Sequence, residues 1–180
     1  MGNRRNIKFE KISRKNFIAS CEKIAKKYNE NINLDETYDN LKLPVRKTKN
    51  SAGYDFFIPF NFTAVEGETI LIPTGIRCSM DEDLALEIYP RSSYGFKYGM
   101  RISNTVGIID SDYYHADNEG HIMIKIMFDN VSYGIDSTLR KSYNFNAGDA
   151  FVQGIFKQYF ISMEDSTNEK RVGGTGSTGN

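Results

Sequence analysis

The sequence predicts a mainly β protein built as an antiparallel sandwich or barrel. From Tyr54 onward, short apolar or alternating runs recur along the chain, each with the length of a β-strand. Turn residues, chiefly Gly, Pro, Asn and Asp, separate these runs. Only residues 14–29 have the apolar spacing of an amphipathic helix. Many short strands with one helix favour a sandwich or barrel that carries a helical insertion.

The N-terminal region contains the predicted helix. Residues 6–12 alternate imperfectly between apolar and polar side chains, as a short edge strand does. Ser13 is then a suitable N-cap for the helix over residues 14–29, and Asn29 a suitable end. The apolar residues of the helix form one stripe: Phe17, Ile18, Cys21, Ile24, Ala25 and Tyr28. Residues 30–51 are mostly polar and predict an extended connection.

Seven runs account for the predicted strands. They are Asp55–Pro59, Thr69–Ile72, Gly75–Cys78, Leu84–Tyr89, Val106–Ile109, His121–Phe128 and Phe151–Ile161. Residues 164–180 contain almost no large apolar side chain, so they cannot contribute much to a core. A chain of 180 residues is long enough for one domain with a sizeable core. We therefore predict one β-rich domain over residues 1–163 and a flexible C-terminal tail over residues 164–180.

Composition limits the classes of partner. The formal net charge is zero, so the chain as a whole does not attract nucleic acid, and none is expected as a direct partner. No apolar run approaches the roughly 18 residues of a membrane helix, and no signal-peptide core follows Met1. Cys21 and Cys78 lie far apart in sequence and lack metal-binding spacing. We therefore expect a reduced, cytoplasmic protein without a membrane partner.

Residues 90–95 hold donors that suit a phosphate group. Arg91 offers a planar fork of N–H donors with a permanent charge, and Ser92 and Ser93 add hydroxyl donors. Gly95 lets the backbone approach a ligand closely. Taken alone, the same residues are also typical of an exposed turn.

Two carboxylates and an aromatic ring follow a short distance along the chain. Asp110 comes after an apolar run that predicts a buried strand, so its carboxylate could hold and deprotonate a water at the rim of the core. Asp112 follows two residues later, and the Tyr113 ring could pack against a deoxyribose and exclude a ribose 2′-hydroxyl. The simpler alternatives are an Asp that caps a turn and a Tyr that packs in the core.

Two further polar segments match known ligand sites only in part. Residues 174–180 have the outer glycines of a P-loop, but Asn180 stands in place of its Lys, so we reject a Walker nucleotide fold. The amides and hydroxyls of this segment can still contact phosphate oxygens. Residues 115–121 carry alternating His, Asp and Glu side chains without a zinc spacing. We expect them to form a solvated hairpin extension.

Five segments together resemble the trimeric dUTPase family. They are Ala52-Gly53-Tyr54-Asp55, Pro90–Ser93, Asn104–Tyr113, Gly148-Asp149 with Gln153, and Arg171 with Gly173–Gly179. The resemblance covers roughly residues 41–179, and the helix at 14–29 looks like an insertion after the first strand. It implies a jelly-roll-like β-barrel or sandwich that forms a homotrimer, with active sites at the subunit interfaces.

The resemblance also implies a reaction and roles for the matched residues. The family hydrolyses dUTP to dUMP and pyrophosphate with Mg²⁺, which keeps uracil out of DNA and supplies dUMP. Asp110 would activate the attacking water, and Asp55 would act indirectly by ordering Arg91 or a metal-bound water. The tail would close over a triphosphate bound by Arg91, Ser92, Ser93, Gln153, Arg171, Gly174, Ser177 and Thr178. The base and sugar would contact Asn104, Gly107, Ile109 and Tyr113.

Two alternatives remain open. A dCTP deaminase shares this fold and would need a glutamate near the base, for which Glu119 is the nearest candidate. A nucleotide-dependent binding module would use the N-terminal region to contact a regulatory protein, because residues 1–50 hold 13 Lys/Arg and only 6 Asp/Glu. The pattern over Ile109–Tyr113 favours the hydrolase. The roles of the helix at 14–29 and of the loop at 114–119 stay open.

Overall fold

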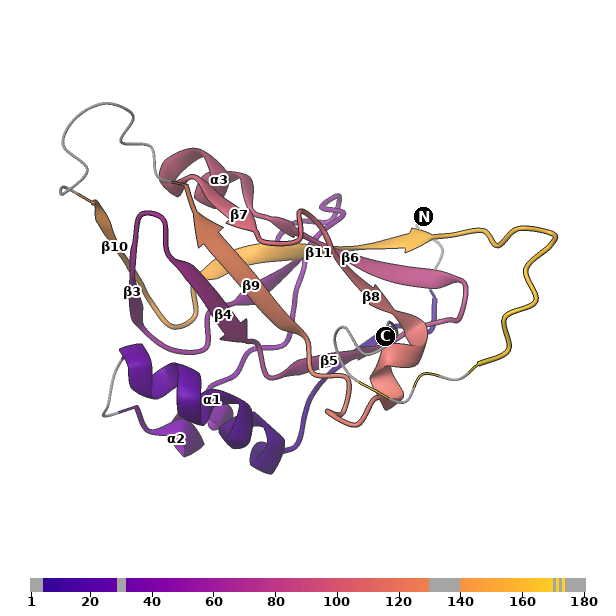
Figure 1. Cartoon of the computed structure of the whole chain (residues 1–180), viewed down its shortest axis with the longest axis horizontal. Helices are drawn as coiled ribbons and strands as arrows, with labels where there is room; N and C mark the ends of the chain where they lie inside the picture. The colour runs from indigo at the N-terminus through magenta and orange to yellow at the C-terminus, as the bar shows by residue number, and fades with distance from the viewer. Residues whose placement is uncertain (1–4, 29–31, 130–139, 170, 172, 174–180) are drawn as a thin grey trace.

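The computed structural model describes residues 5–28, 32–129, 140–169, 171 and 173. Figure 1 shows a β-rich body with helices α1 (Arg14–Tyr28) and α2 (Leu34–Asp39) along one side and the short helix α3 (Ser92–Tyr98) on the opposite side. The strands are β1 (Lys8–Lys11), β2 (Tyr54–Phe57), β3 (Phe62–Val65), β4 (Thr69–Pro73), β5 (Ile76–Ser79), β6 (Leu84–Pro90), β7 (Met100–Ile102), β8 (Gly107–Asp110), β9 (Met123–Phe128), β10 (Ser142–Phe145) and β11 (Ala150–Gln158). A 3₁₀ helix, η1 (Ser111–His115), follows β8.

The strands of the described residues pair antiparallel. The largest sheet has the order β2-β11-β6-β8, and a second sheet has the order β4-β9-β7. Two-stranded sheets join β1 to β5 and β3 to β10. The prediction of a mainly β, jelly-roll-type fold with an N-terminal helix is confirmed. The sheets are open, as in a sandwich, and do not close into a barrel.

Strand β11 lies between β2 and β6 in the largest sheet, and its Gly154 lies close to side chains of both neighbouring strands. A Cβ atom at Gly154 would lie 2.8 Å from Leu86 Cδ1 and 3.0 Å from Phe56 Cε2. Glycine therefore lets side chains from both neighbouring strands close over β11. Phe151 and Val152 are fully buried beside it. This packing fixes the register of β11 against β2 and β6.

Helix α1 confirms the predicted helix. Its Phe17 and Cys21 side chains are fully buried against the sheets. Burial raises the pKa of the Cys21 thiol and of the Cys78 thiol to about 12, so both stay protonated at neutral pH. Among the described residues, none of the helices is long and apolar enough to cross a membrane.

Helix α2 shows that the predicted extended connection over residues 30–51 is wrong in part. The helix is capped by Asn33, whose side-chain oxygen accepts a hydrogen bond from the Glu36 N–H at 3.2 Å. None of the helix residues is fully buried. An apolar stripe is therefore too weak to detect in the sequence, and capping and tertiary contacts stabilise the helix.

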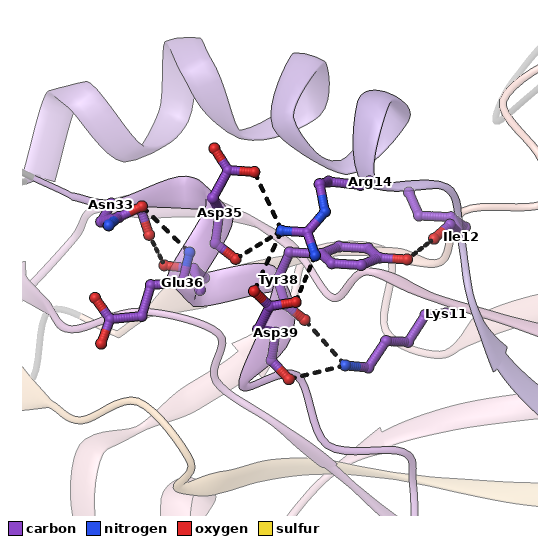
Figure 2. Close-up of polar contacts among 9 residues, drawn as sticks. Lys11, Ile12, Arg14, Asn33, Asp35, Glu36, Tyr38 and Asp39 are labelled. Atoms are coloured by element: carbon purple, nitrogen blue, oxygen red, sulfur yellow. Dashed lines mark hydrogen bonds and ion pairs between the residues drawn. The ribbon is translucent and has the colours of Figure 1, made fainter.

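Figure 2 shows how α2 is attached to α1. The Arg14 guanidinium lies 3.1 Å from Asp35 Oδ1 and 2.5 Å from Asp39 Oδ1. Its Cζ also lies 4.6 Å from the centre of the Tyr38 ring. The Tyr38 hydroxyl donates to the Ile12 carbonyl at 2.7 Å, which anchors α2 to the residue after β1. The two helices therefore form one layer on this side of the domain.

The predicted strands are confirmed, and their boundaries differ from the prediction by at most three residues. Strand β8 was predicted to be buried, but it lies at the edge of the largest sheet, where Ile108 is 61% exposed. Strands β3 and β10, with four residues each, and β7, with three, were not predicted. The three residues of β7 direct only two side chains toward the core, too few to reveal alternation in the sequence. The turn considered for residues 92–95 is part of α3.

Candidate active site

Several predicted phosphate ligands gather at one end of the largest sheet. Gln153 of β11 lies opposite Asp55 of β2 and Tyr89 of β6 in the strand register. Arg91 follows Tyr89 by two residues in extended conformation, so its side chain emerges on the same face. Its Nε lies 3.3 Å from Asp55 Oδ1. We call Asp55, Arg91, Ser92 and Gln153 the Arg91 cluster.

The Arg91 side chain is oriented within the chain itself. Its Nη1 donates to the Ala150 carbonyl at 3.2 Å, and its N–H donates to the Phe151 carbonyl at 3.1 Å. The ion pair with Asp55 is largely shielded, since 28% of the Arg91 side chain and 14% of the Asp55 side chain are exposed. A guanidinium fixed in this way suits a phosphate group, because little freedom is lost when the anion binds.

Gly53, the residue before β2, packs too closely against Gln153 to carry a side chain. A Cβ atom at Gly53 would lie 2.4 Å from Gln153 Oε1 and 3.0 Å from Gln153 Cβ. The Gln153 amide therefore lies against the Gly53 backbone, and any side chain at residue 53 would displace it. This explains the physical need for glycine in the first of the five motifs.

The Arg91 cluster opens into a cavity of about 630 Å³. Arg91 is the N-cap residue of α3, and Ser92 and Ser93 form the first turn of that helix. Arg91, Ser92, Gln153 and Lys157 line the cavity together with Phe96, whose side chain is 93% exposed. The volume is within the usual range for a small-molecule site, and two cations with hydroxyl and amide groups suit an anion.

Asp110, the predicted general base, lies elsewhere on the same sheet. Asp110 ends β8, and Asp112 follows in η1. Arg171 bridges the two carboxylates: its Nη2 lies 2.5 Å from Asp110 Oδ2 and its Nε lies 2.8 Å from Asp112 Oδ1. About half of each carboxylate side chain is exposed. We call Asp110, Asp112, Tyr113 and Arg171 the Asp110 cluster.

Tyr113 is held at both its hydroxyl and its ring. The hydroxyl donates to the His121 carbonyl and accepts from Asn118 Nδ2, each at 2.8 Å. The Arg171 Cζ lies 5.7 Å from the ring centre. Only 5% of Tyr113 is exposed in the single chain. The ring therefore has one fixed orientation next to the carboxylates.

The two clusters are far apart within one chain. Ala85 of β6 pairs with Asp110, while Arg91 follows the other end of β6. The six residue-to-residue steps from Ala85 to Arg91 span about 20 Å in extended conformation. Residues 85, 87, 89 and 91 share one face, so Asp110 and Arg91 emerge on the same face of the sheet at opposite ends. One chain thus presents two halves of the predicted site.

The residues predicted to contact the uracil base of the nucleotide lie on the same segment as Asp110. Asn104 is exposed in the connection between β7 and β8, next to Thr105 with φ of 67°. Gly107 begins β8, and a Cβ atom there would lie 3.3 Å from Ile88 Cβ, so the backbone packs closely on β6. Ile109 packs partly against the core. A base read along β8 would therefore be aligned with Asp110.

Comparison with known proteins identifies the family. The dUTPase family model matches residues 39–179. The deoxyuridine 5′-triphosphate nucleotidohydrolase of Lactococcus lactis is 37% identical over 143 residues, which cover 77% of this chain and 89% of that protein. The chain belongs to the dUTPase family. The corresponding protein of Shewanella amazonensis is 34% identical over 145 residues, which cover 76% of this chain and 86% of that protein.

Solved dUTPase structures have the same fold. The dUTPase of Streptococcus mutans superposes with a TM-score of 0.60 at 30% identity, covering 86% of this chain and 97% of that chain. A dUTPase variant from phage phi11 of S. aureus superposes with a TM-score of 0.61, covering 91% of this chain and 97% of that chain. At 18% identity, the phage protein supports the fold alone.

The last dUTPase motif lies mostly outside the described residues. Gly174, Ser177 and Thr178, predicted to contact phosphate, are all in that part of the tail. Arg171 is described, and its guanidinium contacts the carboxylates of its own chain rather than the Arg91 cluster. Its predicted contact with phosphate would require it to exchange these partners.

The loop after Tyr113 is not the solvated hairpin extension that the sequence predicted. His121 is 1% exposed, and its Nε2 accepts from the Gly75 N–H at 2.9 Å. Glu119 accepts from the Ser13 N–H at 2.6 Å, a hydrogen bond that lowers the pKa of this carboxyl below its ordinary value. The error arises because α1, distant in sequence, covers this loop. Local sequence carries no signal for such a contact.

The burial of His121 predicts a pH-dependent stability. Burial lowers the pKa of this imidazole from 6.5 to about 4. Because the folded state binds fewer protons than the unfolded state, the stabilisation is complete above pH 6.5 and is lost as the pH falls toward 4. As the pH falls from 6.5 to 4, we expect protonation of His121 in the unfolded state to reduce the free energy of unfolding by about 1.4 kcal/mol per pH unit, about 3 kcal/mol in total.

Comparison with His121→Gln isolates this contribution. The Gln amide does not titrate, and it can still accept from the Gly75 N–H. The free energy of unfolding would be measured by denaturant titration of both proteins from neutral pH to pH 4. The wild-type chain should lose more stability than the variant across this range. Parallel curves would contradict the prediction.

Proposed function

We propose that this dUTPase-family enzyme hydrolyses dUTP to dUMP and pyrophosphate, which keeps uracil out of DNA and supplies dUMP. Membership of the family supports the choice of substrate. The observation that carries the mechanism is the pair of half-sites on one sheet face, with phosphate-binding groups in the Arg91 cluster and a carboxylate base in the Asp110 cluster. A cytoplasmic location is part of this proposal.

The Arg91 cluster would bind the triphosphate. Arg91 provides an oriented fork of donors, Ser92 a hydroxyl and Gln153 an amide, all around the same cavity. Asp55 keeps Arg91 in place through their ion pair. These groups position the phosphorus chain, which is the main requirement for catalysis of phosphoryl transfer.

Asp110 would act as the general base. It takes a proton from a water molecule while the water oxygen forms a bond to the α-phosphorus. The bond from this phosphorus to the oxygen that bridges to the β-phosphorus breaks, and pyrophosphate leaves with that oxygen. The proton on Asp110 then returns to solvent. A carboxylate half exposed at a strand end can both reach a water and release the proton.

The residues fit a Mg²⁺ ion that is held largely by the substrate. Within the described ranges no group of three or more His, Cys, Asp or Glu side chains is arranged to hold a metal. Mg²⁺ in nucleotide sites keeps several waters and needs only one or two carboxylates in addition to phosphates. Asp55 would provide that carboxylate, through water. When bound, the ion neutralises phosphate charge and favours departure of pyrophosphate.

We infer a homotrimer that completes the site. A head-to-tail interface brings opposite ends of one surface together, and three subunits joined in this way form a closed ring when each is rotated by a third of a turn. The Asp110 cluster of one subunit would then face the Arg91 cluster of the next. Ile108, on β8, is 61% exposed, and Phe160 and Met163, beyond β11, are 89% and 104% exposed. Figure 1 shows the segment after β11 extending away from the body of the domain, where a neighbouring subunit could cover it.

Arg171 would change partners when nucleotide binds. Its guanidinium now bridges Asp110 and Asp112. Triphosphate oxygens carry more negative charge and also accept bidentate hydrogen bonds from Arg. The exchange would release Asp110 to take a proton, while the tail that includes Gly174, Ser177 and Thr178 closes over the substrate.

The structure does not favour the dCTP deaminase alternative. That reaction needed Glu119 near the base, but both carboxylate oxygens of Glu119 accept hydrogen bonds from the N-terminus of α1. We therefore assign Glu119 no role in attack on a base. A regulatory protein partner for the N-terminal region stays a prediction.

A nucleotide panel tests the proposed function. With Mg²⁺, the purified protein should release pyrophosphate from dUTP and act on dCTP about 10⁴-fold less efficiently, because a site that pairs with uracil leaves polar groups unpaired against cytosine. Pyrophosphate would be measured with dUTP, dTTP, dCTP and UTP side by side. Chelation of the metal should abolish the activity. Ammonia release from dCTP, or intact dUTP in the presence of Mg²⁺, would contradict the assignment.

A further inference from the structure

Helix α1 lies outside the segment that matches the dUTPase family, yet its N-terminus contacts the loop that follows the Asp110 cluster. Glu119 Oε2 accepts from the Ser13 N–H at 2.6 Å, and Glu119 Oε1 accepts from Asn16 Nδ2 at 2.7 Å. A carboxylate at this position satisfies a donor at the helix start and interacts favourably with the helix dipole. The loop and the helix therefore stabilise each other.

His121 provides a second contact one helical turn further along. Because its Nε2 accepts from the Gly75 N–H, its Nδ1 carries the proton and can donate to Ser20 Oγ at 3.3 Å. The Ser20 hydroxyl donates in turn to the Asn16 carbonyl at 2.8 Å. The loop is thus attached to α1 at two successive turns.

The same loop fixes the orientation of Tyr113. Asn118 and the His121 carbonyl both hydrogen-bond to the Tyr113 hydroxyl. Gly120 packs so tightly that a Cβ atom there would lie 2.7 Å from the Tyr113 carbonyl oxygen. Between Asn118 and Gly120, Glu119 adopts φ of 61°, a left-handed conformation that is unfavourable for a residue with a side chain. Its contacts with α1 offset this cost.

We propose that α1 braces the part of the site that recognises the sugar, with Glu119 as a positioning residue. Glu119 ties residues 118–121 to α1, and those residues hold the Tyr113 ring. This inference rests on the proposed function and on the predicted contact of the Tyr113 ring with the deoxyribose of the substrate. Asp110 is held separately, by the pairing of β8 with β6. Loss of the brace should therefore weaken the discrimination between dUTP and UTP more than it lowers kcat for dUTP.

The substitution Glu119→Gly separates the carboxylate contact from backbone strain. Glycine adopts the left-handed conformation without strain, so a defect of the variant would not come from strain at residue 119. We expect the ratio of kcat/KM for dUTP to that for UTP to fall about tenfold or more, because a small displacement of a positioned group has a large effect. The kcat for dUTP should change by less than about threefold. Asp117→Asn, an exposed carboxylate in the same loop, should change neither quantity.

A substitution on the helix side tests the same contact without altering the loop. Asn16→Ala removes one partner of Glu119 and should lower the dUTP-to-UTP ratio in the same direction. In the double variant the effects should not add, since both substitutions remove one interaction. A lower melting temperature with an unchanged ratio in both single variants would overturn the proposal and leave α1 a stabilising element only. Failure of the proposed function would differ, because the unmodified protein would then release no pyrophosphate from dUTP.

Discussion

Replacing Asp110 with Asn should lower kcat for dUTP hydrolysis by about 10³-fold. Asn has nearly the same shape as Asp but cannot take a proton, so the attacking water would stay poorly nucleophilic. Nucleotide binding should persist, because Arg91, Ser92 and Gln153 bind phosphate at the other end of the sheet and are unchanged in this variant. Pyrophosphate release at saturating dUTP and Mg²⁺ measures kcat. The affinity for an analogue with an imido bridge between the α- and β-phosphates measures binding.

Asp112→Asn is the matched control. Asp112 binds the same Arg171 side chain and has a similar exposure, 55% against 50% for Asp110. If Asp110 acts as the base, Asp112→Asn should cost less than about tenfold, as expected for a partly exposed ion pair. Equal losses in the two variants would mean that the Arg171 bridge, and not proton transfer, explains the effect.

Mixing two inactive variants should restore activity. Arg91→Gln disables the phosphate half of the site, and Asp110→Asn disables the base half. If each site combines Arg91 of one subunit with Asp110 of another, random assembly from equal amounts leaves both halves intact in about a quarter of the sites. The two proteins would be unfolded together and refolded as a mixture. Pyrophosphate release from dUTP should then recover to about a quarter of the wild-type rate.

The controls make this result specific to shared sites. Each variant refolded alone should stay inactive, and native mass spectrometry should show trimers that contain both chains. Because Arg91 also pairs with Asp55, the folded fraction of Arg91→Gln would be measured and used to normalise the rates. Mixed trimers without recovered activity would show that each site lies within one subunit, and the arrangement proposed above would be wrong.

The strand and helix signals of the sequence were local ones. Phe17 and Cys21 recur at helical spacing, and their burial in α1 follows from that pattern. The long runs in β6 and β11 alternate enough to be recognised, whereas the three residues of β7 do not. Helix α2 was missed because its stability comes from the Asn33 cap and from Arg14, rather than from a buried stripe.

Sequence by itself identified the chemistry of this protein: the residue types in the motifs around Asp55, Arg91, Asp110 and Gln153, and the family they indicate. Only the tertiary structure decided how these groups are arranged. Antiparallel pairing of β6 with β8 places Arg91 and Asp110 about 20 Å apart, because register and strand length set that separation. Packing of α1 over the loop buries His121 and turns Glu119 into a helix cap, contacts between residues about a hundred positions apart that no local pattern can encode.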